Sequence, residues 1–411
     1  MNMQIIDLAV VGAGPAGMMA AITAASNGNS VILIEKNGSA GKKLLITGNG
    51  RCNLTNTASM NDFLKKFQKK GSFLRTAFTR FTNKDLMDFF ESRGLKLKVE
   101  SDGRVFPVTD KSNDVLNLLL KELKKLSVTI KYSTRVVSVH PEHDGFVLKL
   151  DNVRDVRAKN VILATGGISY KVTGSDGDGH LIAKETGHNI TALEPGIVPV
   201  KTHEFWVREL SGLQLESALG LIKHSKGKLK IEGDLLFTHQ GLSGPMILNN
   251  SPNLVKILKQ DERILLNIDI YPDKTVNQLS DEFLSARDEH GKVDLDNHMK
   301  LKLPNRMIPL FLEMAGVKPK IKMNQLGKKE RNKIINLLKS FPLTITSTSS
   351  IDKAMVTCGG VSSKDFDPNT MESRHHDGLF FAGELVDSCG PSGGYNLQQA
   401  FSTGHLAGSM I

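Results

Sequence analysis

The sequence has few cysteines, and their spacing narrows the chemistry that the chain can perform. Cys52, Cys358 and Cys389 are the only cysteines among 411 residues, and no C-x-x-C occurs. They are too few and too far apart for a disulfide framework, and the missing C-x-x-C argues against a dithiol reductase and a zinc ribbon. We therefore expect each cysteine to be a buried or incidental thiol rather than a nucleophile.

Long apolar runs are also missing. No stretch approaches the roughly 18 consecutive apolar residues of a membrane-spanning helix. The N-terminus lacks the basic segment, apolar core and cleavage site of a secretory signal, because the first expected strand begins almost at once. With 40% hydrophobic and 23% charged residues, the composition is typical of a soluble globular protein. We expect a cytoplasmic protein with two or three domains.

Side-chain clusters that hold metals or perform acid–base catalysis are equally hard to find. No paired carboxylates, catalytic triad or metal-ligand spacing stands out. His375 and His376 are adjacent rather than one helical turn apart, which does not suit a metal site. We expect no bound metal.

Positive charge, in contrast, is in excess and unevenly distributed. The net charge is +10, and residues 318–339 hold eight Lys and Arg against Glu330 alone. Such a surface can attract anionic small molecules or nucleic acid. Because no nucleic-acid-binding motif accompanies the lysines, we favour a solvated surface and expect no nucleic-acid partner. A protein that binds RNA or modifies tRNA remains an alternative.

The N-terminal 36 residues carry the strongest functional motif. An apolar run, Ile5–Val11, predicts a buried strand, and Gly12, Gly14 and Gly17 then form G-x-G-x-x-G where a helix begins. The glycines permit a tight turn, approach of a pyrophosphate to the backbone and close packing of the helix. Glu35 ends the next predicted strand, where an acid can accept hydrogen bonds from ribose hydroxyls. The unit predicts a bound dinucleotide and leaves open which one.

Four glycine-containing segments further along favour a flavin over a nicotinamide cofactor. Gly38–Asn53 combines four glycines with two lysines and an arginine, which suits a polyphosphate. Asn160–Tyr170 reads as a strand running into A-T-G-G, and Gly378–Glu384 reads as a final sheet strand. The turn Gly393–Asn396 precedes the last helix, whose N-terminus favours negative charge.

These patterns predict an α/β fold with a discontinuous Rossmann-like domain interrupted by two inserts. We expect residues 1–192 and 344–411 to form the cofactor domain. Short strands predict a small β-rich insert over 193–271, and helical patterns predict a basic helical insert over 272–343.

Several blocks together resemble one bacterial family, the two-dinucleotide-binding-domain flavoproteins that include aminoacetone oxidase and a bile-acid 3-oxo-steroid reductase. The resemblance covers nearly the whole chain. It rests on GAGPAG (Gly12–Gly17), GKKLLITGNGRCN (Gly41–Asn53), DGRVFPV (Asp102–Val108), ATGG (Ala164–Gly167), LFTHQGLSGP (Leu236–Pro245), TCGGV (Thr357–Val361), TMESR (Thr370–Arg374) and the stretch GLFFAGE to GGYNLQQAFSTG (Gly378–Gly404).

The resemblance implies noncovalent FAD and assigns cofactor contacts. The glycine turn would face the pyrophosphate, Glu35 the adenosine ribose and Val136 the adenine, while Asn396, Leu397 and Gln398 would approach the isoalloxazine. Cys52 would be a contact rather than a covalent link or redox thiol. The full expected set is Gly12, Ala13, Gly14, Pro15, Ala16, Gly17, Glu35, Lys36, Lys42, Lys43, Leu44, Thr47, Gly48, Gly50, Arg51, Cys52, Asn53, Val136, Ala164, Thr165, Gly166, Gly383, Glu384, Asp387, Gly394, Asn396, Leu397 and Gln398.

The same resemblance implies an FAD-dependent oxidoreductase acting on a small organic substrate. One possible reaction is oxidation of an amine such as aminoacetone with O₂ as acceptor, and another is NAD(P)H-dependent reduction of an enone or steroid-like substrate. No second G-x-G-x-x-G marks a stable NAD(P)H domain. His239, beside the flexible Gly241–Gly244, is our candidate catalytic base because of its position and titration range. A structural role for His239 is at least as plausible, and Tyr170 is a weaker candidate.

Overall fold

The chain folds into two compact units. The computed structural model describes residues 5–67, 70–151 and 153–411. One unit comprises Met1–Gly196 and Ser350–Ile411, and the other comprises Ile197–Ser349. The second unit is therefore an insertion within the first.

A seven-stranded sheet organises the first unit, in the order β6-β2-β1-β9-β8-β7 with β18 also paired to β9. The β1 strand runs parallel to β2 and β9, and β18 runs parallel to β9, whereas β7, β8 and β9 pair antiparallel. The strands are β1 (Ile6–Val11), β2 (Val31–Ile34), β6 (Thr129–Lys131), β7 (Val136–Glu142), β8 (Gly145–Leu150), β9 (Val156–Leu163) and β18 (Leu379–Phe381). The expected Rossmann-type α/β class is confirmed.

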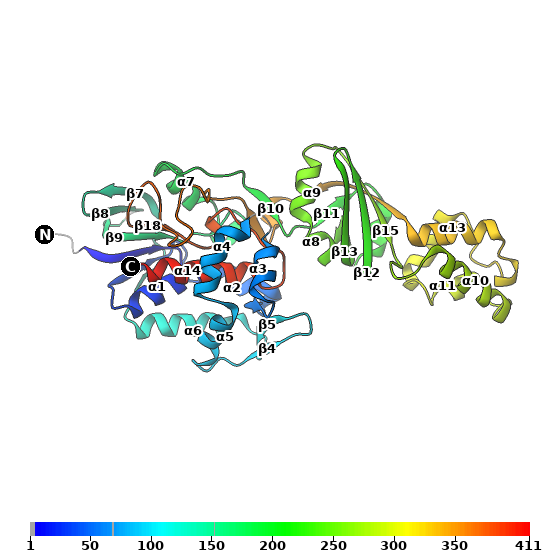
Figure 1. Cartoon of the computed structure of the whole chain (residues 1–411), viewed down its shortest axis with the longest axis horizontal. Coiled ribbons are helices and arrows are strands. Elements are labelled where there is room, and N and C mark those ends of the chain that lie inside the picture. Colours follow the sequence, from blue (N-terminus) through cyan, green and yellow to red (C-terminus); the bar gives the residue numbers. More distant parts are fainter. Residues whose placement is uncertain (1–4, 68–69, 152) are drawn as a thin grey trace. The chain divides into compact units, whose positions relative to one another are not determined.

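Two helices from opposite ends of the sequence pack together beside this sheet (Figure 1). They are α1 (Pro15–Ser26) and α14 (Tyr395–Ser409). A Cβ on Gly404 would lie 2.2 Å from the Ala16 carbonyl oxygen, and one on Gly408 would lie 2.4 Å from that of Ala20. Glycine at both positions thus lets the backbones meet, and it holds the start of α14 near the glycine turn.

Smaller elements surround the sheet and complete the first unit. Two small sheets lie outside the main sheet. One is an antiparallel ribbon of β10 and β17, and the other is three-stranded in the order β3-β5-β4. These elements are α2 (Lys42–Ile46), β3 (Thr55–Asn56), α3 (Met60–Lys66), α4 (Gly71–Arg80), α5 (Asn83–Glu91), β4 (Leu97–Val99), β5 (Arg104–Pro107), α6 (Ser112–Lys125), α7 (Asp178–Glu185), β10 (Glu194–Gly196) and β17 (Val356–Cys358).

The second unit is a closed barrel with helices that share its core. The strands follow the order β11-β14-β13-β12-β15-β16, and residues of α10, α12 and α13 pack in the same apolar cluster. The elements are β11 (Val200–Thr202), β12 (Gln214–His224), β13 (Gly227–Thr238), β14 (Gly241–Ser243), α8 (Pro245–Leu248), α9 (Ser251–Leu258), β15 (Ile264–Asp269), α10 (Val276–Glu289), α11 (Leu295–Met299), α12 (Ile308–Ala315), α13 (Lys328–Lys339) and β16 (Phe341–Thr348).

The last barrel strand crosses the boundary that we placed between residues 343 and 344. In the structure β16 pairs with both β15 and β11 and closes the barrel. Buried and half-buried residues alternate along β16. Strands of the barrel and strands of the α/β domain can both show this alternation, so the sequence pattern could not tell which domain β16 belongs to.

The cysteines depart from expectation. Cys358 and Cys389 form a disulfide with Cα atoms 5.1 Å apart, so the prediction that both are thiols is wrong. Sequence separation misled us, since the fold brings β17 beside the segment that precedes α14. Cys52 is free and buried. In the described parts of the chain, no helix has both the length and the apolar character needed to cross a bilayer.

Candidate functional site

The glycine turn between β1 and α1 forms one wall of a pocket in the first unit. Gly12 has φ +103°, and a Cβ there would lie 2.6 Å from the Ala164 carbonyl oxygen, so only glycine fits. A Cβ on Gly14 would meet nothing within 4 Å, and no side chain caps α1. The N–H groups at the start of α1 therefore remain available for an anion.

Glu35 stands directly after β2 and ties the turn to the next loop. One carboxylate oxygen accepts the Ala13 N–H at 2.9 Å, and the other accepts the backbone and side-chain N–H groups of Asn37 at 2.8 and 2.7 Å. The carboxylate is buried and lines the pocket. This places an acceptor where a ribose hydroxyl is expected.

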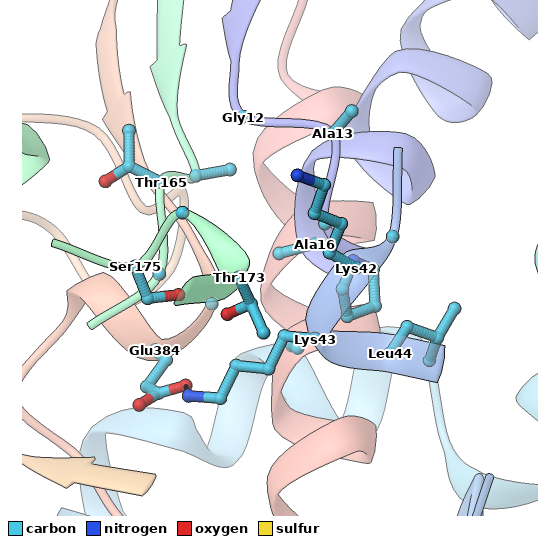
Figure 2. A pocket seen from close by; sticks show the side chains of 18 of the residues that line it. Gly12, Ala13, Ala16, Lys42, Lys43, Leu44, Thr165, Thr173, Ser175 and Glu384 are labelled. Atoms are coloured by element: carbon cyan, nitrogen blue, oxygen red, sulfur yellow. Dashed lines mark hydrogen bonds and ion pairs between the residues drawn. The ribbon is translucent and has the colours of Figure 1, made fainter. Parts of the chain in front are cut away.

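An ion pair spans the pocket between α2 and the loop after β18. Lys43 Nζ lies 2.7 Å from Glu384 Oε2 (Figure 2). It also donates to Ser169 Oγ at 2.7 Å. Thr357 N–H donates to the other Glu384 oxygen at 2.7 Å. Burial alone would raise the pKa of Glu384, but the Lys43 ammonium and these hydrogen bonds outweigh it and lower that pKa. Glu384 is therefore ionised at neutral pH.

The pocket gathers most of the expected cofactor residues from four separate parts of the sequence. The expected residues that line it are Gly12, Ala13, Gly14, Pro15, Ala16, Glu35, Lys36, Lys42, Lys43, Leu44, Thr47, Val136, Ala164, Thr165, Gly166, Gly383, Glu384, Asn396 and Leu397.

Other expected residues lie around the pocket rather than in its lining. Arg51 pairs with Glu100 at 2.8 Å and stacks on Phe106 at 4.0 Å. Asp387 pairs with Lys70. The remaining members of this group are Gly17, Gly48, Gly50, Cys52, Asn53, Gly394 and Gln398.

Two of these residues, Gly17 and Gln398, make clear structural contacts, and a third, Cys52, is buried. A Cβ on Gly17 would lie 1.9 Å from the Gly12 carbonyl oxygen, so Gly17 brings α1 against the turn. Gln398 accepts the Thr55 hydroxyl at 2.6 Å in the interior. Burial raises the pKa of the Cys52 thiol to about 12, which keeps it protonated at neutral pH.

His239 is not among the residues that line this pocket. It occupies the exposed turn between β13 and β14 of the second unit. Tyr170 has φ +54° and precedes a short 3₁₀ turn, and it too is not among the lining residues. A catalytic role for His239 remains a prediction.

Several pocket residues escaped sequence reasoning. Thr173 and Ser175 face the pocket from the loop after β9 (Figure 2). Gly174 between them also lines it, and the sequence showed only a glycine-rich turn there. Val356 is the first residue of β17, Met355 directly precedes that strand, and Ser388 directly precedes Cys389. These residues do not belong to a motif with fixed spacing, so a single sequence gives no indication that they line the pocket.

Comparison with known proteins identifies the family. The HI0933-like protein Rossmann domain matches residues 6–410. The chain belongs to this family. It is 32% identical over 403 residues to a 3-dehydro-bile acid delta(4,6)-reductase from Clostridium scindens, covering 98% of both chains. It is 31% identical to a ribosomal RNA dihydrouridine synthase from Escherichia coli, covering 98% of this chain and 96% of the other.

Solved structures support the fold. A 3-ketosteroid delta1-dehydrogenase from Sterolibacterium denitrificans aligns with a TM-score of 0.55 at 14% identity, covering 99% of each chain. As a member of the HI0933-like family, the chain is an FAD-dependent oxidoreductase, and the expected cofactor and enzyme class are confirmed.

The pocket residues fit FAD. The uncapped start of α1 suits the pyrophosphate, and Lys42, for which no ion pair is found among the described residues, supplies positive charge. Within the described residues, Thr165 Oγ1 and Ser388 Oγ are buried without a hydrogen-bond partner, although both residues line the pocket. Buried polar atoms are normally satisfied, so these two favour a polar ligand.

Proposed function

We propose that this protein is an FAD-dependent reductase that saturates a carbon–carbon double bond conjugated to a carbonyl. The observation that carries the proposal is the near-complete match to relatives of two kinds, at 32% and 31% identity. Reduction of a 4,6-dien-3-one and conversion of uridine to dihydrouridine both saturate such a bond. The reaction type is thus common to relatives whose named substrates differ.

The residues of the pocket have definable tasks in this reaction. FAD, when bound, supplies hydride transfer. Gly12–Ala16, Glu35 and Lys42 would hold its adenosine and pyrophosphate, and the Lys43–Glu384 pair would fix the opposite wall. Asn396 and Leu397 begin a 15-residue helix and line the pocket, so the positive end of the α14 dipole favours negative charge there.

For the substrate we favour a uracil base in RNA. The second unit carries 23 Lys and Arg against 17 Asp and Glu, which accounts for six of the ten net charges. The exposed tip of the β12–β13 hairpin carries Lys223, Lys226 and Lys228. In the described residues no ion pair is found for Lys318, Lys328, Lys329, Arg331 or Lys333, and unpaired cations suit phosphates. This proposal departs from our expectation that no nucleic acid is bound.

A steroid-like enone is the second candidate. The bile-acid reductase is the relative with 32% identity, and nothing in the described pocket excludes an apolar ring system. Oxidation of aminoacetone by O₂, which the sequence resemblance also suggested, remains a third possibility that the same experiment tests.

The test is to photoreduce the purified holoenzyme without oxygen and follow return of oxidised-flavin absorbance after mixing. The acceptors are an unmodified ribosomal RNA transcript, a 4,6-dien-3-one steroid and O₂, and nucleosides from the RNA are analysed by mass spectrometry for a gain of two hydrogens. We expect RNA to reoxidise the flavin and to contain dihydrouridine.

The other outcomes discriminate between the candidates. Reoxidation by the steroid alone would replace RNA by an enone as the substrate class. Fast reoxidation by O₂, with aminoacetone reducing the flavin, would overturn the reductase proposal. Separate reduction trials with NADH and NADPH identify the electron donor.

A further inference from the structure

The disulfide joins two walls of the FAD pocket. Cys358 ends β17, whose Val356 lines the pocket, and Cys389 directly follows the pocket residue Ser388. Both cysteines belong to the first unit and are 31 residues apart in sequence. The bond thus lies one or two residues from the lining on each side.

On the first side, β17 is connected to the centre of the site. Thr357 N–H donates to Glu384 at 2.7 Å, and Thr357 Oγ1 accepts the N–H groups of Ile168 and Ser169 at 2.8 and 3.2 Å. A Cβ on Gly196 would lie 2.5 Å from Cys358 Sγ, so β10 packs directly on the sulfur. Displacement of Cys358 would therefore shift Thr357 and disturb the positions of Glu384 and its partner Lys43.

On the second side, the segment after Cys389 holds the start of α14. Gly390 N–H donates to Asn396 Oδ1 at 2.8 Å, and Asn396 Nδ2 donates to the carbonyl oxygens of Gly390 and Pro391 at 2.9 and 3.1 Å. Asn396 itself lines the pocket. The covalent bond therefore connects the Glu384 wall to the α14 wall.

The two cysteines of the disulfide are half-buried. Cys52, in contrast, is fully enclosed. A single half-buried disulfide in a chain with a large apolar core is unlike the dense frameworks that stabilise small secreted domains. Disulfides of this kind in reducing compartments are commonly catalytic or redox-sensing.

We propose that Cys358–Cys389 is a thiol-reducible bond that controls how long the protein retains FAD. Two molecules of a low-molecular-weight thiol deliver two electrons and two protons. The S–S bond breaks, each cysteine sulfur becomes a thiol, and the two donor molecules join as one disulfide. With the bond open, the two pocket walls move independently and FAD leaves faster.

The experiment measures FAD release from the holoenzyme. Air-purified protein, with and without dithiothreitol, is diluted into FAD-free buffer, and free FAD is followed by its fluorescence. Alkylation and mass spectrometry report the state of each cysteine in the same samples. We expect only Cys52 to be labelled after denaturation of the untreated protein, and all three cysteines after reduction. We expect FAD release to be about tenfold faster after reduction. This factor is a modest part of the stabilisation that one cross-link can contribute.

Variants separate this mechanism from a general effect of the reductant. The Cys358→Ser/Cys389→Ser protein should release FAD at the fast rate with or without dithiothreitol. Cys52→Ser should keep the full difference between the oxidised and reduced states. Equal release rates from oxidised and reduced wild-type protein, or labelled Cys358 in the untreated protein, would overturn the proposal whether or not the double variant folds. Neither readout depends on which substrate is reduced.

Discussion

At the scale of single residues, Thr165 offers the cleanest test of cofactor binding. Its hydroxyl is buried and has no partner among the described residues, so Thr165→Val should leave the free energy of unfolding of the apoprotein within about 0.5 kcal/mol of wild type. Loss of a hydrogen bond to FAD should raise the FAD dissociation constant about fivefold, or about 1 kcal/mol. Fluorescence titration of apoprotein measures this constant.

Thr186→Val is the matched control. The Thr186 hydroxyl donates to the Ile182 carbonyl oxygen at 3.0 Å, and Thr186 does not line the pocket, so this variant should lose about 1 kcal/mol of stability and keep its FAD affinity. The reverse pattern in the two variants would show that Thr165 is structural.

The Lys43–Glu384 pair allows a second residue-scale prediction. Glu384→Gln removes the charge that balances Lys43, and we expect a loss of about 2 kcal/mol in the free energy of unfolding. Lys43→Met should cost a similar amount, and the double variant should cost less than the sum, because the two changes remove one interaction. Urea unfolding of the four proteins measures this coupling, and additive losses would contradict it.

Two histidines predict how stability depends on pH. Burial lowers the pKa of both His180 and His188 to about 4, below the usual value of 6.5. Both rings stay neutral in the folded chain while the unfolded chain takes up protons, so stability falls as pH drops from about 6.5 towards 4. Each histidine contributes at most about 3 kcal/mol to this loss.

Substitution of one histidine tests this assignment. His180 is buried and its ring stays neutral in the folded chain, so His180→Phe should flatten the dependence of unfolding free energy on pH. The exposed His143→Phe is the control and should leave the dependence unchanged. Parallel pH profiles for wild type and His180→Phe would contradict the assignment.

At the scale of elements, the contact between α1 and α14 explains why the site needs both ends of the chain. A Cβ on Gly404 would lie 2.2 Å from backbone, so Gly404→Ala should cost about 1–3 kcal/mol of stability through overpacking. Ser409→Ala, in the last turn of the same helix, should change stability by about 0.5 kcal/mol or less. Chemical denaturation of both variants measures the difference, and equal effects would mean that the helices separate without cost.

Elements also show how far the sequence could predict this molecule. The β1–α1–β2 unit was predictable because Gly12, Gly17 and Glu35 obey fixed spacing. The barrel was missed as a closed structure because β16 pairs with strands more than 70 residues away. The disulfide was missed because the proximity of Cys358 to Cys389 depends on how β17 and the α14 segment pack. Local patterns predict elements, whereas tertiary packing decides which of them meet.

At the scale of the whole molecule, the two units suggest a division between redox chemistry and substrate capture. The first unit contains every residue that lines the FAD pocket, and the second carries most of the excess positive charge. If the proposed RNA substrate is correct, the cations of the second unit should affect RNA binding without altering the reactivity of the reduced flavin.

A triple variant separates these tasks. Lys328, Lys329 and Lys333 are exposed on α13, and Lys121, Lys124 and Lys125 are exposed on α6 of the first unit. Replacing the α13 lysines by Gln should weaken RNA binding and reduce the slope of log K against log salt by about 2–3, roughly one per lost phosphate contact. Replacing the α6 lysines by Gln removes the same charge and should leave that slope unchanged. Reoxidation of photoreduced flavin by a small enone should be equal in both variants. Equal loss of RNA affinity in the two would instead mean that total charge, rather than the α13 surface, attracts RNA.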